Sequence, residues 1–197
     1  MIPLIVVLAI LVILVIFYIA NFNGLVGLRN QMKNAWAQID VQLKRRRDLI
    51  PNLVETVKGY MEHERGTLEA VTNARNLAQS VSSSANVADI AKAEGALSGA
   101  LSRLLAVVEN YPNLKANENF LALQEELTST ENKISFSRQY YNDSVLKYNN
   151  KIQMFPSNII AGIGGFKAGD FFEVTAPEER EPVKVSFAKE PPKTGTK

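Results

Sequence analysis

The chain has 197 residues, of which 46% are hydrophobic and 21% are charged, and its net charge of +2 is too small to indicate a nucleic-acid partner. It contains no cysteine and one histidine, His63, which excludes a thiol nucleophile and zinc sites built from several cysteines or histidines. We therefore expect no metal, no cofactor and no small-molecule substrate. His63 is expected to be a polar surface or inter-helix residue, because no set of catalytic partners accompanies it.

Residues 1–21 are predicted to form a transmembrane anchor. Residues 2–20 carry no charge and are mostly large aliphatics, and as a helix they would be about 28 Å long, close to the ~30 Å hydrocarbon core of a bilayer. A cleaved signal peptide would need a basic start, a shorter apolar stretch and a small-residue cleavage site, and these are absent. Arg29 and Lys33 follow the span, so the positive-inside rule predicts an external N-terminus and a cytoplasmic remainder.

Residues 22–172 are predicted to fold as an all-α, up-and-down bundle of four long, coiled-coil-like helices. Apolar residues recur at every seventh position early and late in this region. Between these parts they alternate at spacings of three and four, with Glu94 as the one interruption. The expected helices are 24–47, 48–80, 86–111 and 117–155, followed by an irregular glycine-rich segment at 156–172 and a disordered tail at 173–197.

The sequence KRRRDLIPN, residues 44–52, is predicted to mark the boundary between the first two helices. Asp48 is a good N-cap, and Pro51 would fall in the first turn, where its missing N–H has no cost. The preceding basic residues would lie in the last turn of the first helix and meet the negative end of its dipole; they are Arg45, Arg46 and Arg47. A helix unbroken from 24 to 80 would be about 85 Å long, with half of it lacking an intramolecular partner.

A continuous but kinked helix is the alternative. One apolar row passes from Ile39 through Arg46 to Leu53 without losing its phase, and a row beginning at Trp36 lies beside it. In that case the half without a partner would imply self-association.

The last predicted helix carries an internal repeat, YNDSVLK followed by YNNKIQM, which places Tyr and Asn side by side on successive turns of the apolar row. The tyrosines could simply direct their hydroxyls to the bundle rim, and we favour this interpretation. Alternatively the repeat forms a polar ladder that fixes register with Arg46 or with a neighbouring subunit. The residues concerned are Tyr141, Asn142, Tyr148 and Asn149.

Two long segments behind the anchor resemble the LemA family of bacterial membrane proteins. They are NAWAQIDVQLKRRRDLIPNL and its continuation to residue 75, and YPNLKANENFLALQEELTSTENKISFSRQYYNDSVLKYNNKIQMFPSNIIA at 111–161. The resemblance covers nearly everything from the anchor to about Phe172. It implies a four-helix bundle held to the inner membrane with no assigned catalytic activity. Members often occur beside an HtpX-type membrane zinc metalloprotease, and a related protein takes part in forming magnetosome membranes.

We therefore expect a non-enzymatic, single-pass protein of the bacterial inner membrane whose cytoplasmic helices form a scaffold that organises or shapes the membrane. Its partners would be the lipid bilayer and further copies of itself. The alternative is an adaptor or regulator of another membrane protein, such as an HtpX-type metalloprotease. An enzyme is a third class, and it would require a catalytic role for His63.

Overall fold

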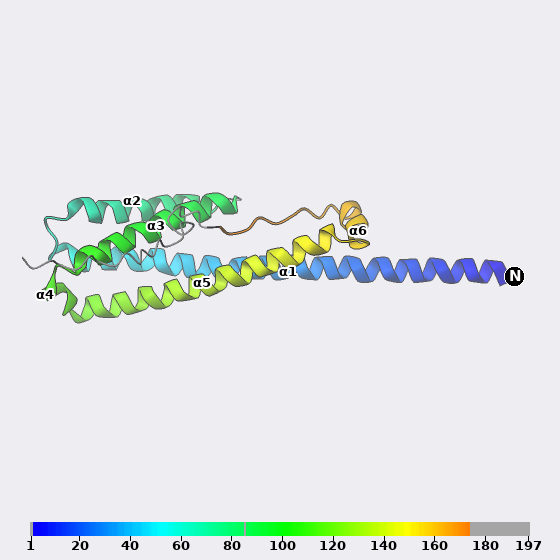
Figure 1. Ribbon diagram of the computed structural model, residues 1–197, viewed down its shortest axis with the longest axis horizontal. Coiled ribbons are helices and arrows are strands. Elements are labelled where there is room, and N and C mark those ends of the chain that lie inside the picture. The colour runs from blue at the N-terminus through cyan, green and yellow to red at the C-terminus, as the bar shows by residue number, and fades with distance from the viewer. Residues whose placement is uncertain (1, 85, 174–197) are drawn as a thin grey trace, which may run out of the picture.

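The computed structural model describes residues 2–84 and 86–173, and every regular element in these ranges is an α-helix. The predicted all-α class is confirmed for this part of the chain. The expected disorder of residues 173–197 falls, except for residue 173, outside the described residues. The molecule is elongated, and one helix, α1, runs along its whole length (Figure 1).

Helix α1 (Ile2–Lys58) contains 57 residues, which corresponds to a length of about 86 Å. Its first part, through Ala20, is exposed on all sides, and it is long and apolar enough to cross a membrane. From Leu25 onward one face of the same helix is buried, at positions that follow the seven-residue row predicted from the sequence. The apolar span and the folded part of the molecule are therefore joined without a flexible linker.

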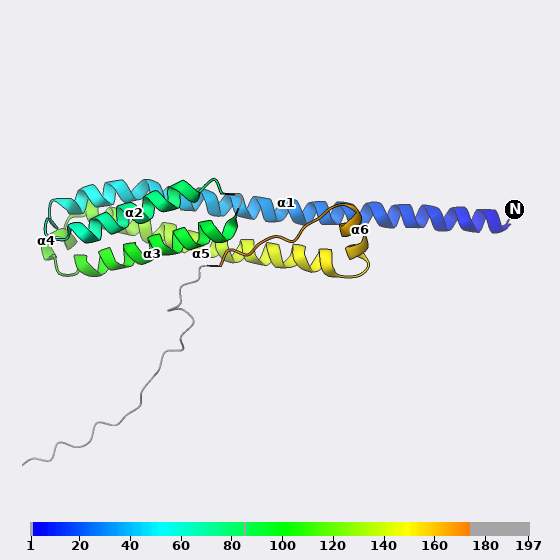
Figure 2. The same cartoon turned by 90° about the horizontal axis from the view of Figure 1, so that it is seen from above.

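Within the described ranges, α1 is followed by five helices: the three longer ones run up and down beside it, and the two short ones lie at the two ends of the last long helix (Figure 2). Two of them begin with an asparagine cap: the side chain of Asn86 accepts a hydrogen bond from the Ala88 N–H, and that of Asn117 from the Phe120 N–H, both at 3.0 Å. The elements are α2 (Arg65–Val81), α3 (Val87–Val108), α4 (Pro112–Lys115), α5 (Glu118–Gln153) and α6 (Ser157–Ile163).

The long helices differ in how much of α1 they cover. Beyond the apolar span, residues 21–58 of α1 are about 57 Å long, and α5, with 36 residues, is about 54 Å long. Helices α2 and α3, with 17 and 22 residues, are only about 26 and 33 Å long, and they cover the end far from the N-terminus (Figure 1). The long helices are therefore unequal in length, and α1 extends well beyond the predicted helix 24–47.

The predicted boundary at Asp48 and Pro51 is wrong. The helix is continuous there, as in the alternative, although the alternative extended a kinked helix to residue 80. Helix α1 passes through both residues, ends at Lys58, and is followed by a turn at residues 59–64. Asp48 is an exposed residue inside the helix rather than an N-cap. The length argument failed because it carried the unbroken helix to residue 80; a helix ending at Lys58 finds a partner of matching length in α5.

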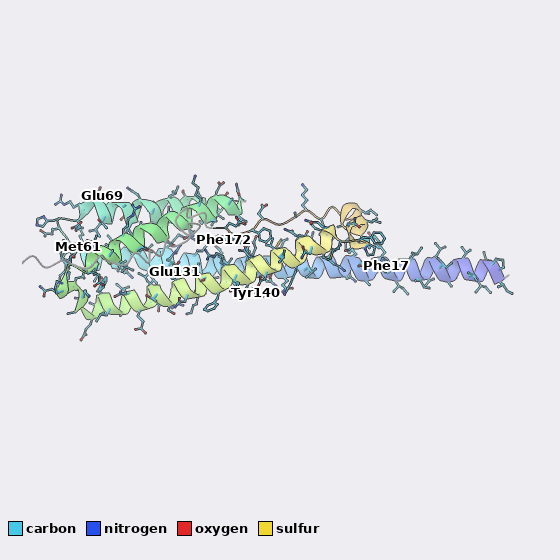
Figure 3. The ribbon with its side chains drawn as sticks, viewed as in Figure 1. Phe17, Met61, Glu69, Glu131, Tyr140 and Phe172 are labelled. Atoms are coloured by element: carbon cyan, nitrogen blue, oxygen red, sulfur yellow. The ribbon has the colours of Figure 1, made fainter. Side chains whose placement is uncertain are left out.

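The buried residues form clusters along the axis of the rod. The largest joins α1, α2, α3 and the start of α5. Met61, from the turn between α1 and α2, is fully buried in this cluster (Figure 3). A middle cluster joins α1 and α5 to the start of α3 and to Phe172. A small one joins Leu25 of α1 to α6. The row of every seventh residue in α5 is buried from Phe120 to Tyr148, but its predicted last member, Phe155, lies beyond the helix and is 80% exposed.

Candidate functional site

Four charged side chains meet in the interior, where α1, α3 and α5 approach one another. Arg46 donates to Glu94 at 2.5 Å and to Glu131 at 2.6 Å, and Arg47 donates to the other carboxylate oxygen of Glu94 at 2.5 Å. Arg46 also donates to the Ser98 hydroxyl at 2.7 Å. The side chains of Arg46 and Glu94 are both 2% exposed, whereas that of Glu131 is 51% exposed. We call Arg46, Arg47, Glu94 and Glu131 the ion cluster.

The ion cluster balances two positive charges with two negative ones. Each oxygen of Glu94 accepts from a different arginine, so this carboxylate bridges two successive residues of α1. Burying an ionised side chain is unfavourable unless it is paired and hydrogen-bonded, and both conditions hold for Glu94. The arrangement ties α3 and α5 to one level of α1.

Pro51 explains a second contact of the basic run. Because proline lacks an N–H, the carbonyl four residues earlier, that of Arg47, has no helical partner at Pro51. Arg75 of α2 donates its Nε–H to this carbonyl at 3.1 Å. The interruption in the hydrogen bonds of α1 is thus filled by the neighbouring helix, and α1 continues. Arg45 points elsewhere and pairs with Glu126 of α5 at the surface.

The Tyr–Asn repeat of α5 holds the chain that follows α6. Asn149 donates to the carbonyl of Gly169 and accepts from its N–H, both at 2.9 Å, and Asn142 makes the same pair of contacts with Phe172, at 3.2 and 2.9 Å. The neighbouring hydroxyl of Tyr148 donates to the carbonyl of Lys167 at 2.9 Å. These two asparagines pair with an extended backbone as a neighbouring strand would, and we call residues 164–172 the return segment.

Neither interpretation of the repeat was correct in full. A polar ladder exists, and within the chain its partner is the return segment rather than Arg46. The tyrosines do not reach the rim: Tyr141 and Tyr148 are buried, and the Tyr141 hydroxyl donates to the carbonyl of Asp170 at 2.8 Å. Burial, and secondarily the charge of Asp170, raises the pKa of Tyr141 to about 12. Burial also raises the pKa of Tyr148, against a smaller lowering effect of Arg29.

The return segment completes the middle core. Trp36 of α1 packs against Tyr141 and Phe172, with ring centroids 5.3 and 5.9 Å apart. Gly169 allows the close approach, because a Cβ there would lie 2.5 Å from the sulfur of Met32. Trp36 and the Tyr–Asn repeat therefore belong to one assembly, whereas Arg46 and Arg47 belong to the ion cluster.

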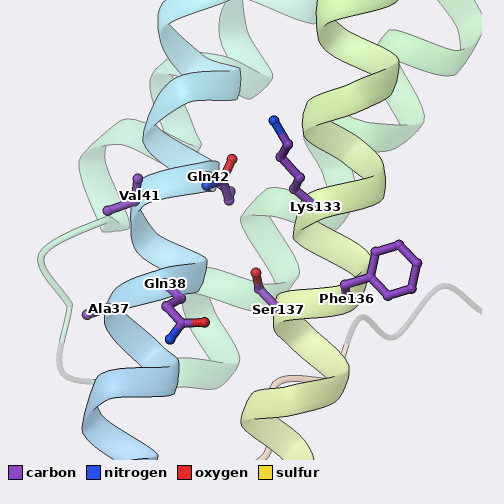
Figure 4. Close-up of a pocket in the computed structure, with 7 residues that line it drawn as sticks. All are labelled: Ala37, Gln38, Val41, Gln42, Lys133, Phe136 and Ser137. Atoms are coloured by element: carbon purple, nitrogen blue, oxygen red, sulfur yellow. The ribbon is translucent and has the colours of Figure 1, made fainter.

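An open groove with a volume of about 470 Å³ lies between α1 and α5 on the side of the rod away from α2 and α3. Its two edges carry exposed apolar side chains, Val41 and Phe136, at 61% and 73% exposure, and polar side chains lie between them (Figure 4). The lining residues are Ala37, Gln38, Val41, Gln42, Lys133, Phe136 and Ser137.

Chemistry-bearing groups are sparse elsewhere. His63 is exposed in the turn between α1 and α2. In the ranges 2–84 and 86–173, no group of three or more His, Asp or Glu side chains is placed to hold a metal ion.

The sequence prediction missed Glu94, Glu131, Arg75 and the return segment as partners. One signal pointed to the ion cluster. Glu94 interrupts the apolar row of α3, and Arg46 interrupts that of α1. Because a buried charge needs a partner of opposite sign, these two positions together indicate a buried ion pair. Glu131 and Arg75 carry no such signal, because neither interrupts an apolar row.

Comparison with known proteins finds a match to the LemA family over residues 35–187. Protein LemA from Metamycoplasma hominis is 27% identical over 145 residues, which is 73% of this chain and 65% of that protein. Magnetosome protein MamQ 2 from Paramagnetospirillum magneticum is 36% identical over 81 residues, 41% of this chain and 30% of its own length. Magnetosome protein MamQ from Magnetospirillum gryphiswaldense is 34% identical over 80 residues, 41% of this chain and 29% of its own.

The chain thus spans about two thirds of this LemA protein and under a third of these magnetosome proteins. None of these names denotes an enzyme. Together with the apolar part of α1, the relatives fit a membrane-associated helical protein.

Proposed function

The chain belongs to the LemA family, and we propose that it is a non-enzymatic scaffold whose copies assemble side by side in the bacterial inner membrane and organise or shape it. Residues 2–20 of α1 span the membrane, with the N-terminus outside and the bundle in the cytoplasm, as Arg29 and Lys33 favour. The helical rod then offers its surface to other proteins.

One observation carries the proposal: α1 and α5, the two longest helices, form an exposed groove edged by Val41 and Phe136. Burying such a side chain fully is worth about 1.5–3 kcal/mol. The anchor supports a second copy as the occupant, because it confines all copies to one plane in one orientation and brings their grooves to the same height. Confinement of this kind raises the effective concentration of the copies for one another, so that weak contacts between them suffice.

Cysteine crosslinking tests the assembly cleanly, because the native chain has no cysteine. Gln38→Cys places a thiol in the groove, and Ser80→Cys is the matched control on α2. The contact of Arg75 with the Arg47 carbonyl sets α2 level with α1, so Ser80 lies close to the height of the groove but on another side. In membranes treated with a short bismaleimide, we expect homodimers from Gln38→Cys and few from Ser80→Cys.

A charge in the groove gives the second arm. Phe136→Glu added to Gln38→Cys should abolish the crosslink, whereas Leu121→Glu, an exposed leucine of α5 outside the groove, should leave it unchanged. Equal crosslinking at the two cysteine positions, or monomers from both, would refute side-by-side assembly. A single foreign adduct at Gln38→Cys would instead favour an adaptor.

A further inference from the structure

A second apolar surface lies next to the membrane span. Residues 152–166 contain no charged side chain and include α6. One face of α6 is buried, with Ile160 and Ala161 packed on Leu25 of α1. The opposite side is exposed although it is apolar: Ile163 is 71% exposed, and Met154, Phe155 and Ile159 are likewise exposed. A water-soluble surface would carry polar groups at these positions.

The position of α6 along α1 coincides with the edge of the bilayer. If residues 2–20 fill the hydrocarbon core, Phe22 and Leu25, which α6 and its neighbours contact, lie about 3–8 Å beyond it. The headgroup layer of a bilayer is about 5–8 Å thick on each side. Figures 1 and 3 show α6 at the point where α1 emerges alone, with Phe17 on the emerging part. The exposed side of α6 is therefore continuous with the surface of the span.

The connection after α6 fixes this geometry. Gly165 has a φ of 65°, a conformation that favours glycine, and the chain reverses there. The ring of Phe166 then packs edge-on against Phe22, with centroids 5.5 Å apart, and the guanidinium of Arg29 lies 5.0 Å from the same ring. Stacked beside Phe22 is Tyr18, a residue type enriched at the level of lipid headgroups.

Positive charges surround the uncharged stretch. Lys147 and Lys151 lie in the last two turns of α5, and Lys167 follows α6. Arg29 and Lys33 lie on α1 farther out, about 14 and 20 Å beyond residue 20. Each basic residue near an anionic membrane surface adds about 1 kcal/mol of attraction. Apolar side chains beside a basic rim are the composition of a helix that lies in the membrane interface.

We propose that residues 154–163, centred on α6, are a second membrane contact that inserts its exposed side chains among anionic phospholipids beside the span and holds the rod upright. The inference rests on α1 crossing the membrane, as proposed above, and not on self-assembly. A second copy is the rival occupant, but the continuity with the span and the basic rim both indicate lipid.

Depth-dependent quenching tests the contact in the full chain reconstituted into vesicles. A fluorophore sensitive to polarity is attached at Ile163→Cys, at Leu77→Cys on α2 as an exposed control, or at Val12→Cys within the span. We expect Ile163→Cys to lose roughly half of its fluorescence to a nitroxide about 5–10 Å deep, the depth at which interfacial helices lie, and Leu77→Cys to lose little. Quenching should be stronger in phosphatidylcholine vesicles that contain phosphatidylglycerol.

The possible outcomes separate the hypotheses. Quenching of Val12→Cys by a deep nitroxide without quenching of Ile163→Cys would overturn the second contact while leaving the anchor intact. Shielding of Ile163→Cys from water without quenching by lipid would assign the surface to a second copy and also overturn it. Equal quenching in neutral and anionic vesicles would refute the role of the basic rim.

A functional arm measures the tilt of the rod. Replacing Phe155, Ile159 and Ile163 together by serine should bring the distal end, labelled at Leu121→Cys, closer to the membrane. Energy transfer from this label to a headgroup acceptor should therefore rise, whereas Leu77→Ser should leave it unchanged. Unchanged transfer in the triple variant would refute the upright brace.

Discussion

Glu94→Gln is the most direct test of the ion cluster, because it keeps the shape of the side chain and removes one of two balancing charges. Arg46 and Arg47, whose side chains are 2% and 8% exposed, would then share Glu131, which contacts only Arg46 and is half exposed. Breaking a buried pair typically costs about 3–5 kcal/mol. At about 2–4 °C per kcal/mol for a domain of this size, the midpoint of thermal unfolding should fall by about 6–20 °C.

The assay is unfolding of the full chain in detergent micelles, by heat for the midpoint and by urea for the free energy, followed by far-ultraviolet circular dichroism. The apolar part of α1 stays helical in the micelle, so the change in signal reports the bundle. Glu125→Gln is the matched control, since Glu125 is an exposed residue of α5, and its effect should stay within about 0.5 kcal/mol.

Removing the buried charges together should recover most of the loss. In the triple variant Arg46→Met, Arg47→Met and Glu94→Leu, no buried ion remains without a partner, and Glu131 can turn to water. A loss below about 1 kcal/mol for Glu94→Gln would show that water already screens the cluster. A triple variant no more stable than Glu94→Gln would refute the reasoning from unpaired charge.

Three further predictions concern the contacts around α1 and α5. Arg75→Ala should cost about 1–2 kcal/mol in the native chain but less than half as much after Pro51→Ala, because the restored N–H can satisfy the same carbonyl. Tyr141→Phe should cost about 1 kcal/mol at neutral pH. The folded-state pKa of Tyr141 is raised from 10.0 to about 12, so between these pH values the native chain binds more protons than the unfolded chain. The free energy of unfolding should therefore fall by about 1–2 kcal/mol as pH rises from 10 to 12. Asn149→Ala should release the return segment, measured as faster amide hydrogen exchange in residues 166–172, whereas Asn150→Ala on the exposed side should not.

Each of these has an outcome that contradicts it. Equal costs of Arg75→Ala in both backgrounds would show that Arg75 does not replace the missing helical bond. Parallel stability curves for native protein and Tyr141→Phe between pH 10 and 12 would exclude a shifted phenol. Slow exchange that persists in Asn149→Ala would mean that packing alone holds the return segment.

The sequence predicted which residues are buried better than it predicted where helices end. Rows such as Phe120 to Tyr148 depend on the helical period alone, so every member of the row supports the same assignment of the buried face. A helix end is decided by a few residues, and here Asp48 with Pro51 gave as strong a local signal as the true end at Lys58. What decided the outcome was distant in sequence: Arg75 satisfies the carbonyl that Pro51 leaves free. No local rule contains that contact.

The Tyr–Asn repeat shows a different limit. The sequence placed Tyr141 and Tyr148 on the apolar row with an asparagine after each, and the favoured interpretation gave the tyrosines no buried partner. The asparagines did not identify a partner either, because an amide can pair with any exposed backbone. The return segment that the asparagines pair with has no periodicity, since it follows the extended backbone of Gly169 and Phe172 rather than a helix. A polar ladder was the less favoured alternative from the sequence, and the return segment was not among its expected partners.

The junction between span and bundle is the point on which a membrane scaffold depends, and the structure braces it from outside the helix. Gly24 and Gly27 lie in α1 at this level, and added Cβ atoms there would meet no described atom within 4 Å, so packing does not require glycine. Each glycine weakens a helix by about 1 kcal/mol relative to alanine. The stiffness of the junction must then come from α6 on Leu25 and from Phe166 on Phe22. In the proposed assembly, the grooves of neighbouring copies would meet only if the rods stood at the same angle, so the proposed contact of α6 with the membrane would be a condition for that assembly.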